Sequence, residues 1–534
     1  MPQRKTINLD AGKRLYTKDG VNNFFYPVSR QTHLDFSVDI IKAYCEVINK
    51  HNDNADINLY KVFGKYFIAE VISVFQGLCL KKGLEEFEYD YQIPTEWRSW
   101  PALLEAKPPK LPPYIKALKT KLKKPNYIKK IFNLTFLKRL MKVASIKSGG
   151  MNVDGLKIKP ITDSVIRNDI ISTQRTHLIT RHAEEVHDDV VFCRSTKWFD
   201  SIDVKGCAKG YQFSQIDKDL LEVTKKIIEK HGIHIDQSLD DYFADIIKKS
   251  MPYLSYYIRA LCAKENLPQR LWIGTSGNIW DSMLKVAVKR NGGYVCGHDH
   301  GTGHAHFASP TMGIIELWGS DEFYTFSSEL EKVAAPWSFM GPKTVKVIEP
   351  KNKEDKKPLF TRTIDQVQKI FLLSTVYEKD RGRLHPLMPD IVQLDWQARF
   401  IAFMKNKNYD VIIKSHPESS FKTPKSFEDT LGAQINSERF EEVFETADLF
   451  IFDYICTSTF TEALKTNIPI MIIDFGDIPW SDKALKLAVK RCAFIKGTCD
   501  KDNRLQIDWD CFNAEVKNAT DRSNNREFYE YYYK

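Results

Sequence analysis

The residues with the clearest chemical potential form a histidine-rich loop, His-Asp-His-Gly-Thr-Gly-His-Ala-His, at positions 298–306. Four of the thirteen histidines of the chain fall within these nine residues, together with two glycines. Histidine is the side chain best suited to proton transfer near neutral pH. The loop follows an apolar run that predicts a strand, and ligands of open α/β sheets bind at the carboxyl ends of strands. We therefore expect a loop that presents a general base to a hydroxyl acceptor.

Two other interpretations of this loop remain open. Histidines at alternate positions are typical of metal ligands, so the loop could hold a metal ion. No distant cluster of cysteines or histidines in the sequence completes such a site, which favours the general base. A polar loop with incidental histidines is the third alternative.

A second candidate site is the hydroxyl-rich turn Cys-Thr-Ser-Thr at 456–459. An apolar run at 449–452 precedes it, and a helix-forming segment at 460–465 and another apolar run at 470–473 follow it, which predicts a βαβ unit. The hydroxyl groups of Thr457, Ser458 and Thr459 and the positive end of the helix dipole favour a phosphoryl group. The glycines of a dinucleotide fingerprint or P-loop are missing, and a purely structural crossover is the alternative.

A third group, Lys-Ser-His-Pro-Glu at 414–418, follows the preceding predicted strand of the same sheet. Lys414 and His416, next to Pro417, would add positive charge and hydrogen bonds for the phosphate of a leaving group.

Alternating strands and helices position these three groups. In the second half of the chain we expect strands at 370–374, 411–414, 449–452 and 470–473 with helices at 393–405, 438–446 and 459–464 between them, which is the pattern of a doubly wound parallel sheet. In the first half we expect strands at 188–193, 271–274, 294–297, 315–318 and 343–348 and helices at 215–230, 242–264, 279–289 and 322–332, the last capped by Asp321.

The N-terminal region, residues 1–150, has apolar residues at helical spacing and is expected to be mainly helical. Its segment 107–147 contains thirteen Lys or Arg residues and no Asp or Glu. Basic residues interleaved with apolar ones are typical of a segment that lies on an anionic membrane surface, and the alternatives are a core helix with a solvated basic face or a nucleic-acid arm. Few aromatic residues and no nucleic-acid module accompany the segment, so no nucleic-acid partner is expected.

The bulk composition fits a soluble globular protein of 534 residues, with 43% hydrophobic and 28% charged residues. No run of eighteen apolar residues and no signal peptide are apparent, so neither a transmembrane helix nor secretion is expected. The ten cysteines show no CxxC pair, which indicates reduced thiols in a cytoplasm.

Together, the three groups resemble those of GT-B glycosyltransferases, and more narrowly of bacterial transferases that build capsule, teichoic acid and related surface polymers. His300-Gly301-Thr302 is similar to the HGT element of CDP-glycerol glycerophosphotransferases, and Phe452-Asp453-Tyr454 with Ser458 resembles their donor-site turn. Lys414, His416 and Pro417 resemble the HP element also seen in bacterial sialyltransferases. The segment 298–324 also looks like a family of surface-carbohydrate transferases with a Q-H-G-G loop, from which this chain departs at Asp299. Cys456 and Thr457 stand where serines are more usual.

The resemblance implies a fold and a role for each residue. It implies an α/β GT-B fold: two Rossmann-like domains facing a cleft, at 151–350 for the acceptor and 365–510 for the nucleotide donor, with the helical N-terminal region in front and a C-terminal tail at 511–534. It implies that His300 is the general base, that Lys414, His416, Pro417, Thr457, Ser458 and Thr459 hold the donor phosphate, that Glu462 reaches the donor ribose, and that His298, Asp299, Gly301, Thr302 and His304 form the acceptor-side loop.

The function expected from these features is a cytoplasmic, inverting glycosyltransferase at the inner face of the cytoplasmic membrane. It would move a sugar from a CMP- or UDP-linked donor to a glycan or lipid-linked glycan. No DxD motif lies between apolar strands, so we expect no metal and no cofactor beyond the donor. The alternatives are a CDP-polyol phosphotransferase, a metal-dependent hydrolase built on His298, His300, His304 and His306, and a binding module without activity.

Overall fold

The computed structural model describes most of the chain. The described residues are 5–10, 14–21, 24–87, 89–92, 100–105, 107, 109–119, 151–153, 156–158, 169–174, 176–186, 190–204, 207, 211–275, 278–300, 304–308, 313–334, 344–347, 360–379, 384, 388–416, 419 and 422–533. Most of the basic segment predicted at 107–147 lies outside these residues.

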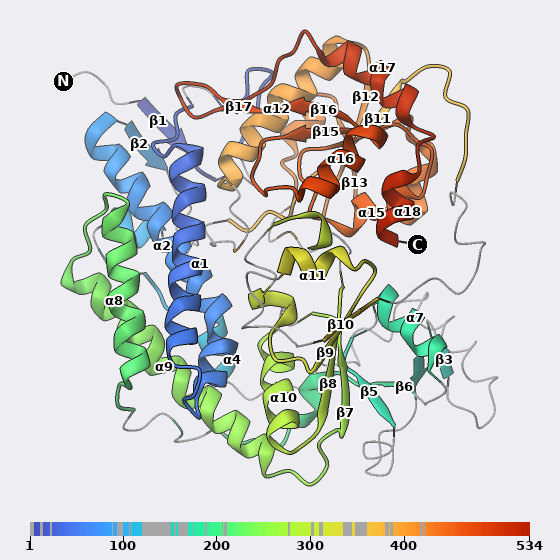
Figure 1. Cartoon of the computed structure of the whole chain (residues 1–534). Coiled ribbons are helices and arrows are strands. Elements are labelled where there is room, and N and C mark those ends of the chain that lie inside the picture. The colour runs from blue at the N-terminus through green and yellow to red at the C-terminus, as the bar shows by residue number, and fades with distance from the viewer. Residues whose placement is uncertain are drawn as a thin grey trace, which may run out of the picture.

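The N-terminal part forms a layer dominated by two long helices, which we call the helical layer (the described residues of 5–119). It consists of β1 (Lys5–Asn8), α1 (Arg30–Lys50), α2 (Ile57–Phe87), β2 (Tyr89–Gln92), α3 (Trp100–Leu104) and α4 (Pro113–Lys119). Ser29 caps α1 by accepting a hydrogen bond from the backbone of Thr32. In Figure 1 these blue helices stand beside the rest of the chain, next to α8 and α9.

The first α/β unit, in residues 151–347, contains an eight-stranded sheet. Its strands are β3 (Met151–Val153), β4 (Leu156–Ile158), β5 (Ile170–Ser172), β6 (Val190–Phe192), β7 (Arg270–Ile273), β8 (Tyr294–His298), β9 (Glu322–Thr325) and β10 (Thr344–Val347). The order across the sheet is β10-β9-β8-β7-β5-β6-β4-β3, and the pairs from β10 to β6 are parallel. The chain order of the strands therefore reverses between β5 and β7.

The helices of this unit are α7 (His177–Glu185), α8 (Gln215–Lys230), α9 (Gln237–Cys262), α10 (Ile279–Arg290) and α11 (Glu329–Ala334), with 3₁₀ turns η2 (Ser195–Trp198) and η3 (His304–His306). Helix α7 packs on one face of the sheet and α9 and α10 on the other, whereas α8 packs against α1 of the helical layer. Leu271 and Ile273 point into the core shared with α9 and α10, whereas Trp272 packs with Ile179 of α7 on the other face. This period-two alternation is the one expected of a strand buried on both sides.

Two predicted elements of this unit are wrong. The segment predicted as a strand at 315–318 is the π-helix η4 (Gly313–Leu317), and the helix predicted at 322–332 is the strand β9 followed by the short α11. Asp321 does not cap a helix, because its carboxylate accepts a hydrogen bond from the backbone of Val295 and its own amide donates to the Val295 carbonyl. These bonds align β9 with β8, where Phe323 and Thr325 are buried and Glu322 and Tyr324 are half-buried.

The second α/β unit, in residues 360–533, contains a six-stranded parallel sheet. Its strands are β11 (Lys369–Leu373), β12 (Asp410–Lys414), β13 (Gln434–Asn436), β14 (Leu449–Phe452), β15 (Ile470–Asp474) and β16 (Ala493–Lys496), and the order is β13-β12-β11-β14-β15-β16. Numbered within the sheet, this order is 3-2-1-4-5-6, which is that of a dinucleotide-binding Rossmann fold. The predicted βαβ unit at 449–473 is confirmed.

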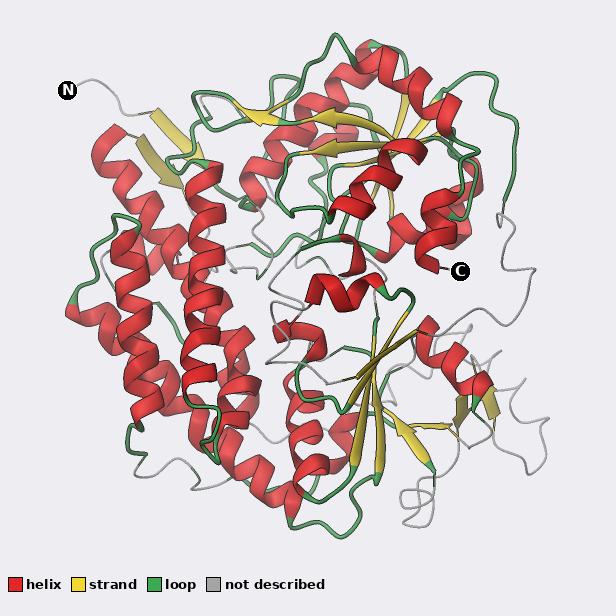
Figure 2. Ribbon diagram, in the orientation of Figure 1, coloured by secondary structure: helices red, strands yellow, loops and turns green. Residues whose placement is uncertain are grey.

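The helices of the second unit also lie on both faces of its sheet (Figure 2). They are α12 (Asp390–Asn406), α13 (Ser426–Asp429), α14 (Phe440–Val443), α15 (Ser458–Leu464), α16 (Asp482–Arg491), α17 (Phe512–Arg522) and α18 (Glu527–Tyr533), with the turn η7 (Phe444–Thr446) and the small hairpin β17 (Thr498–Cys499) and β18 (Leu505–Gln506). Along β14, Leu449 and Ile451 belong to the core cluster with α12 and α17, and Phe450 and Phe452 belong to the cluster with α15, α16 and α18.

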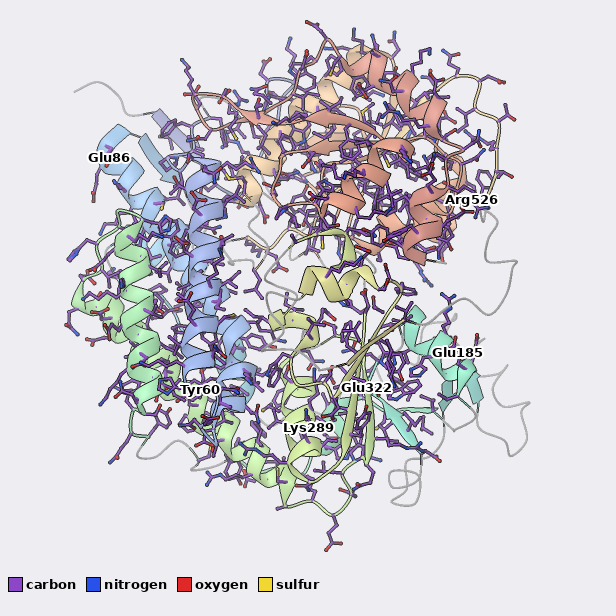
Figure 3. All side chains as sticks on the ribbon, viewed as in Figure 1. Tyr60, Glu86, Glu185, Lys289, Glu322 and Arg526 are labelled. Carbon is purple, nitrogen blue, oxygen red and sulfur yellow. The ribbon has the colours of Figure 1, made fainter. Side chains whose placement is uncertain are left out.

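The helical layer contacts both α/β units. The amide of Val21 donates to the Asp395 carboxylate of α12 at 2.7 Å, and Arg30 Nε donates to Asp477 after β15 at 2.9 Å. On the other side, the Tyr60 hydroxyl of α2 donates to Asp217 at the start of α8 at 2.9 Å, where Figure 3 shows it among the blue and green helices. The layer therefore links the two α/β units.

Helix α2 is long and apolar enough, by length and composition, to cross a membrane between Ile57 and Gly83. In this fold 89% of its most apolar window is buried against other parts of the protein, as in a core helix of a globular protein.

Candidate functional site

The first part of the site lies where the strand order of the first sheet reverses, between β5 and β7. Gln174 follows β5 and Thr275 follows β7. The Gln174 amide donates to the Thr275 carbonyl at 2.7 Å, and the Thr275 amide donates to Gln174 Oε1 at 2.8 Å. These bonds fix the carboxyl ends of the two strands, the position at which open α/β sheets bind ligands.

A histidine–glutamate pair stands next to this switch point. His300 Nδ1 lies 2.9 Å from Oε1 of Glu316, and the Thr275 hydroxyl donates to the same oxygen at 2.9 Å. The His300 side chain is 37% exposed, whereas that of Glu316 is 0% exposed. An ionised Glu316 carboxylate only accepts hydrogen bonds, so with Glu316 in that state Nδ1 would carry the proton and Nε2 would be the nitrogen that can exchange one.

Local backbone structure places Glu316 in this position. It lies in the π-helix η4, a rare element that often occurs at functional sites. Gly319 then turns the chain into β9 with a φ of 77°, a conformation that glycine adopts without strain. The aliphatic end of Lys285, from α10, lies directly beneath Gly319.

Helix α10 contributes two buried ionisable groups near Glu316, namely Asp281 in its first turn and Lys285 in its middle. The ammonium of Lys285 donates to the carbonyl of Trp318, and burial lowers its pKa to about 7, although the Glu316 carboxylate acts in the opposite direction. The Asp281 carboxylate accepts hydrogen bonds from Gln174 at 2.9 Å and Asn278 at 2.6 Å, and burial raises its pKa.

The other histidines of the predicted loop do not join His300. His298 is buried at the end of β8, where its Nε2 lies 2.9 Å from Nδ1 of His182 and its ring stacks on Tyr324. Burial and the neighbouring His182 lower the pKa of His298, and burial lowers that of His182 to about 4. His298 is therefore placed as a neutral core residue.

His306 serves a contact between the two α/β units. Its Nε2 lies 2.8 Å from the hydroxyl of Tyr533, and its carbonyl accepts from the amide of Ser481 at 2.7 Å. His304 begins η3, and Gly301 and Thr302 lie outside the described residues. Among the described residues, no group of three or more His, Cys, Asp or Glu side chains is arranged to hold a metal ion, so the histidines do not converge as the hydrolase alternative would require.

The second part of the site lies at the switch point of the second sheet, between β11 and β14. Asp453 follows β14 and is buried there; its Oδ2 accepts hydrogen bonds from Gln393 and Gln397 of α12, both at 2.8 Å. Burial raises the pKa of Asp453 to about 6, and the hydrogen bonds from the two glutamines oppose that rise. A small cavity of about 20 Å³ lies beside Asp453 and is lined also by Asp474 and Asp477.

The hydroxyl-rich turn is partly used by the fold itself. Thr457 caps α15 by accepting a hydrogen bond from the amide of Thr459 at 3.3 Å, and Ser458, the first helical residue, is exposed. Glu462 is held by Lys465, whose ammonium lies 2.8 and 2.9 Å from the two carboxylate oxygens.

Lys414 and His416 lie at the carboxyl end of β12, on the other side of β11 from the turn. The Lys414 ammonium donates to the carbonyl of Glu438, and burial lowers its pKa. The His416 carbonyl accepts from the amide of Ser419 at 3.2 Å. Pro417 lies outside the described residues.

The carboxyl ends of the strands of the two sheets face each other near Cys456. Burial raises the pKa of the Cys456 thiol to about 12, and the carboxylates of Asp299 and Glu316 in the first unit are close enough to raise it further. Nearby, Phe307 and Trp480 form an isolated β-bridge between the units, and the Ala308 amide donates to the Pro479 carbonyl at 2.9 Å. The His300–Glu316 pair and the segment 453–459, which contains Asp453 and the hydroxyl-rich turn and is called the 453–459 turn below, therefore lie at one junction.

Several residues of this junction were not predicted from the sequence, namely Gln174, Thr275, Asp281, Lys285, Glu316, Gln393 and Gln397. Glu316 left one signal, because it is the single acid in the apolar run Ile-Ile-Glu-Leu-Trp at 314–318. The others come from helices and turns whose sequence resembles that of any cap or helix surface.

A family model described as LIC12162 family transferase matches residues 150–484, and no curated protein matches the chain. Because the match covers more than half of the chain, the protein belongs to this family and is a transferase. The helical layer lies outside the matched residues.

Replacing Asp453 by asparagine should make stability less dependent on pH. The folded pKa of about 6 lies above the value of about 3.9 for an unfolded aspartate, so wild type loses stability as pH rises from 4 to 6 and keeps that loss above it. The free energy of unfolding of Asp453→Asn, relative to wild type, should therefore increase by about 2 kcal/mol between pH 4 and pH 7. Denaturant unfolding at these pH values measures it.

The matched control is Asp410→Asn, which changes an exposed carboxyl group on β12 of the same sheet. Its difference from wild type should change less between pH 4 and pH 7 than that of Asp453→Asn. If the difference in free energy of unfolding between Asp453→Asn and wild type did not change with pH, the raised pKa of the buried Asp453 carboxyl group would be contradicted.

Proposed function

We propose that this family member moves a sugar from a nucleotide-activated donor, CMP- or UDP-linked, to a hydroxyl group of a surface glycan, with His300 as the general base. The observation that carries the proposal is the half-exposed His300 imidazole oriented by the buried Glu316, at the junction with the 453–459 turn. A base oriented by a carboxylate through its other nitrogen is the arrangement that activates hydroxyl groups in many transferases and hydrolases.

In the proposed step, Nε2 of His300 takes the proton of the acceptor hydroxyl group. The hydroxyl oxygen forms a bond to the anomeric carbon, and the bond from that carbon to the donor phosphate breaks. The nucleotide leaves with the electron pair, and the configuration at the anomeric carbon is inverted because attack and departure occur on opposite sides.

The proposed donor side lies on the second sheet, whose strand order is that of nucleotide-binding folds. Lys414 and His416 after β12, and the 457–459 turn after β14, flank the switch point and would stabilise the charge on the leaving phosphate without a metal ion. Glu462 would contact the donor ribose while its carboxylate still accepts the hydrogen bond from Lys465. With the first unit on the acceptor side, the proposed arrangement is that of a GT-B transferase with two Rossmann-like domains.

The proposed setting is the cytoplasmic side of a membrane, where lipid-linked glycans are extended. The basic segment at 107–147 supports this setting by its sequence, since clustered Lys and Arg residues with apolar neighbours bind anionic lipids.

A thermal-shift panel of CMP, CDP, UMP, UDP and GDP, with and without EDTA, tests the donor side. A nucleotide at about 100 times its Kd should add roughly 2.7 kcal/mol to the free energy of unfolding. We expect a clear shift with a cytidine or uridine nucleotide, unaffected by EDTA and lost in His416→Ala.

The control for this panel is His234→Ala, which removes a histidine whose side chain is 85% exposed and remote from the second sheet. Its shift should match that of wild type. The absence of any nucleotide shift, with a fall in stability on adding EDTA, would instead favour a metal site.

Substitutions in the His300–Glu316 pair test the base. His300→Ala should lower the rate of product formation by about 10²- to 10⁴-fold, the range typical of a lost general base, and leave nucleotide binding unchanged. Glu316→Gln should lower the rate by a smaller factor, because the amide no longer favours the protonated Nδ1. An unchanged rate in His300→Ala would contradict the proposed role.

A further inference from the structure

One buried cation near the site comes from outside the matched family region. Lys65 lies on α2 in the helical layer and is 7% exposed. Within the described part of the chain its ammonium has no hydrogen-bond partner, and it lies 4.9 Å from the centroid of the Tyr66 ring. A buried lysine without a partner is rare, because desolvation of the charge is not repaid.

The elements packed against α2 bring three other charged groups to Lys65. Helix α2 contacts α10 and the π-helix η4. From α10 come Lys285 and Asp281, and from η4 comes Glu316, each close enough to act on the charge of Lys65. Gln174 and Asn278 both donate to Oδ2 of Asp281, and among the described residues its buried Oδ1 has no hydrogen-bond partner. The Thr275 hydroxyl donates to Oε1 of Glu316, the same oxygen that faces His300.

Packing does not explain a lysine at this position. Burial and the like charge of Lys285 lower the pKa of Lys65 to about 7. A methionine of similar length would fill the same space without the desolvation cost, and replacing unpaired buried charges by apolar residues is often stabilising. Buried groups that weaken a fold are concentrated at functional sites.

We propose that Lys65 is a positioning residue for the His300–Glu316 pair, a buried cation that balances the Glu316 carboxylate, so that the helical layer is a working part of the acid–base site. The inference deepens the proposed function, since it takes His300 as the base.

The effect of this cation follows from electrostatics. Glu316, at 2.9 Å from His300, favours the protonated imidazole, and a base that stays protonated cannot accept a proton. The carboxylate of Asp299 and the thiol of Cys456 also lie near the pair, and neither adds positive charge. Below about pH 7, where both ammonium groups are protonated, Lys65 and Lys285 supply the positive charge that opposes protonation of His300.

The test is the pH dependence of His300 acylation by diethyl pyrocarbonate, which reacts with unprotonated imidazole, followed by peptide mass spectrometry from pH 5 to 9. In Lys65→Met the midpoint for His300 should move up by about half a pH unit, because a nearby positive charge has been removed. His234, 85% exposed and distant, is an internal reference whose midpoint should not move.

The matched control is Lys61→Met, one turn earlier on α2, where the ammonium donates to Asn52 at 3.2 Å. This variant should leave the His300 midpoint at the wild-type value, and Lys65→Met should unfold at a temperature no lower than wild type.

An unchanged or lowered midpoint in Lys65→Met, or an equal shift in Lys61→Met, would overturn the proposal. A lower unfolding temperature for Lys65→Met, or its failure to fold, would overturn it too, because Lys65 would then be required for packing. Acylation needs no donor or acceptor, so failure of the sugar-transfer proposal would leave this result intact, and the reverse also holds.

Discussion

A carboxylate with no exposed side-chain surface must find its partners inside the protein, and Glu316 is in that position. Its contact with His300 determines much of what surrounds it. The π-helix turns Glu316 toward the switch point of the first sheet, Thr275 at the end of β7 donates to it, and Gly319 returns the chain to β9. The contact orients the imidazole, since His300 faces the buried carboxylate through Nδ1.

The helical layer contacts both α/β units. Arg30 at the start of α1 donates to Asp477, which follows β15 of the second sheet. Lys65 of α2 lies near the charged groups Asp281, Lys285 and Glu316 of the first unit. The helical layer thus contacts the part of the site in the first unit and the edge of the second sheet as well. A linkage of this kind holds the two edges in register, whereas units joined by the intervening segment alone would be free to separate.

Sequence patterns predicted four of the six strands of the second sheet, at 370–374, 411–414, 449–452 and 470–473, because these strands are buried on both faces and separated by clear helices. The edge strands β13 and β16 are more exposed and were not predicted. The first unit was harder between 313 and 334. Two isoleucines in Gly-Ile-Ile-Glu-Leu favour a strand locally, and the π-helical conformation depends on contacts with Thr275 and His300 that are distant in sequence. Glu322-Phe-Tyr-Thr continues into a helix-forming segment, so only its pairing with β8 identifies it as a strand. Lys65 could not be linked to the site at all, since no local pattern relates residue 65 to residue 316.

The most direct test of a site shared by the two sheets is a crystal structure of the protein with the nucleotide that stabilises it most. We predict that the nucleotide binds at the switch point of the second sheet, with its phosphate within hydrogen-bond distance of His416 or the 457–459 turn. The phosphate oxygen that was bonded to the sugar should point toward His300. A nucleotide bound away from β11 and β14, or with its phosphate directed away from His300, would contradict this account.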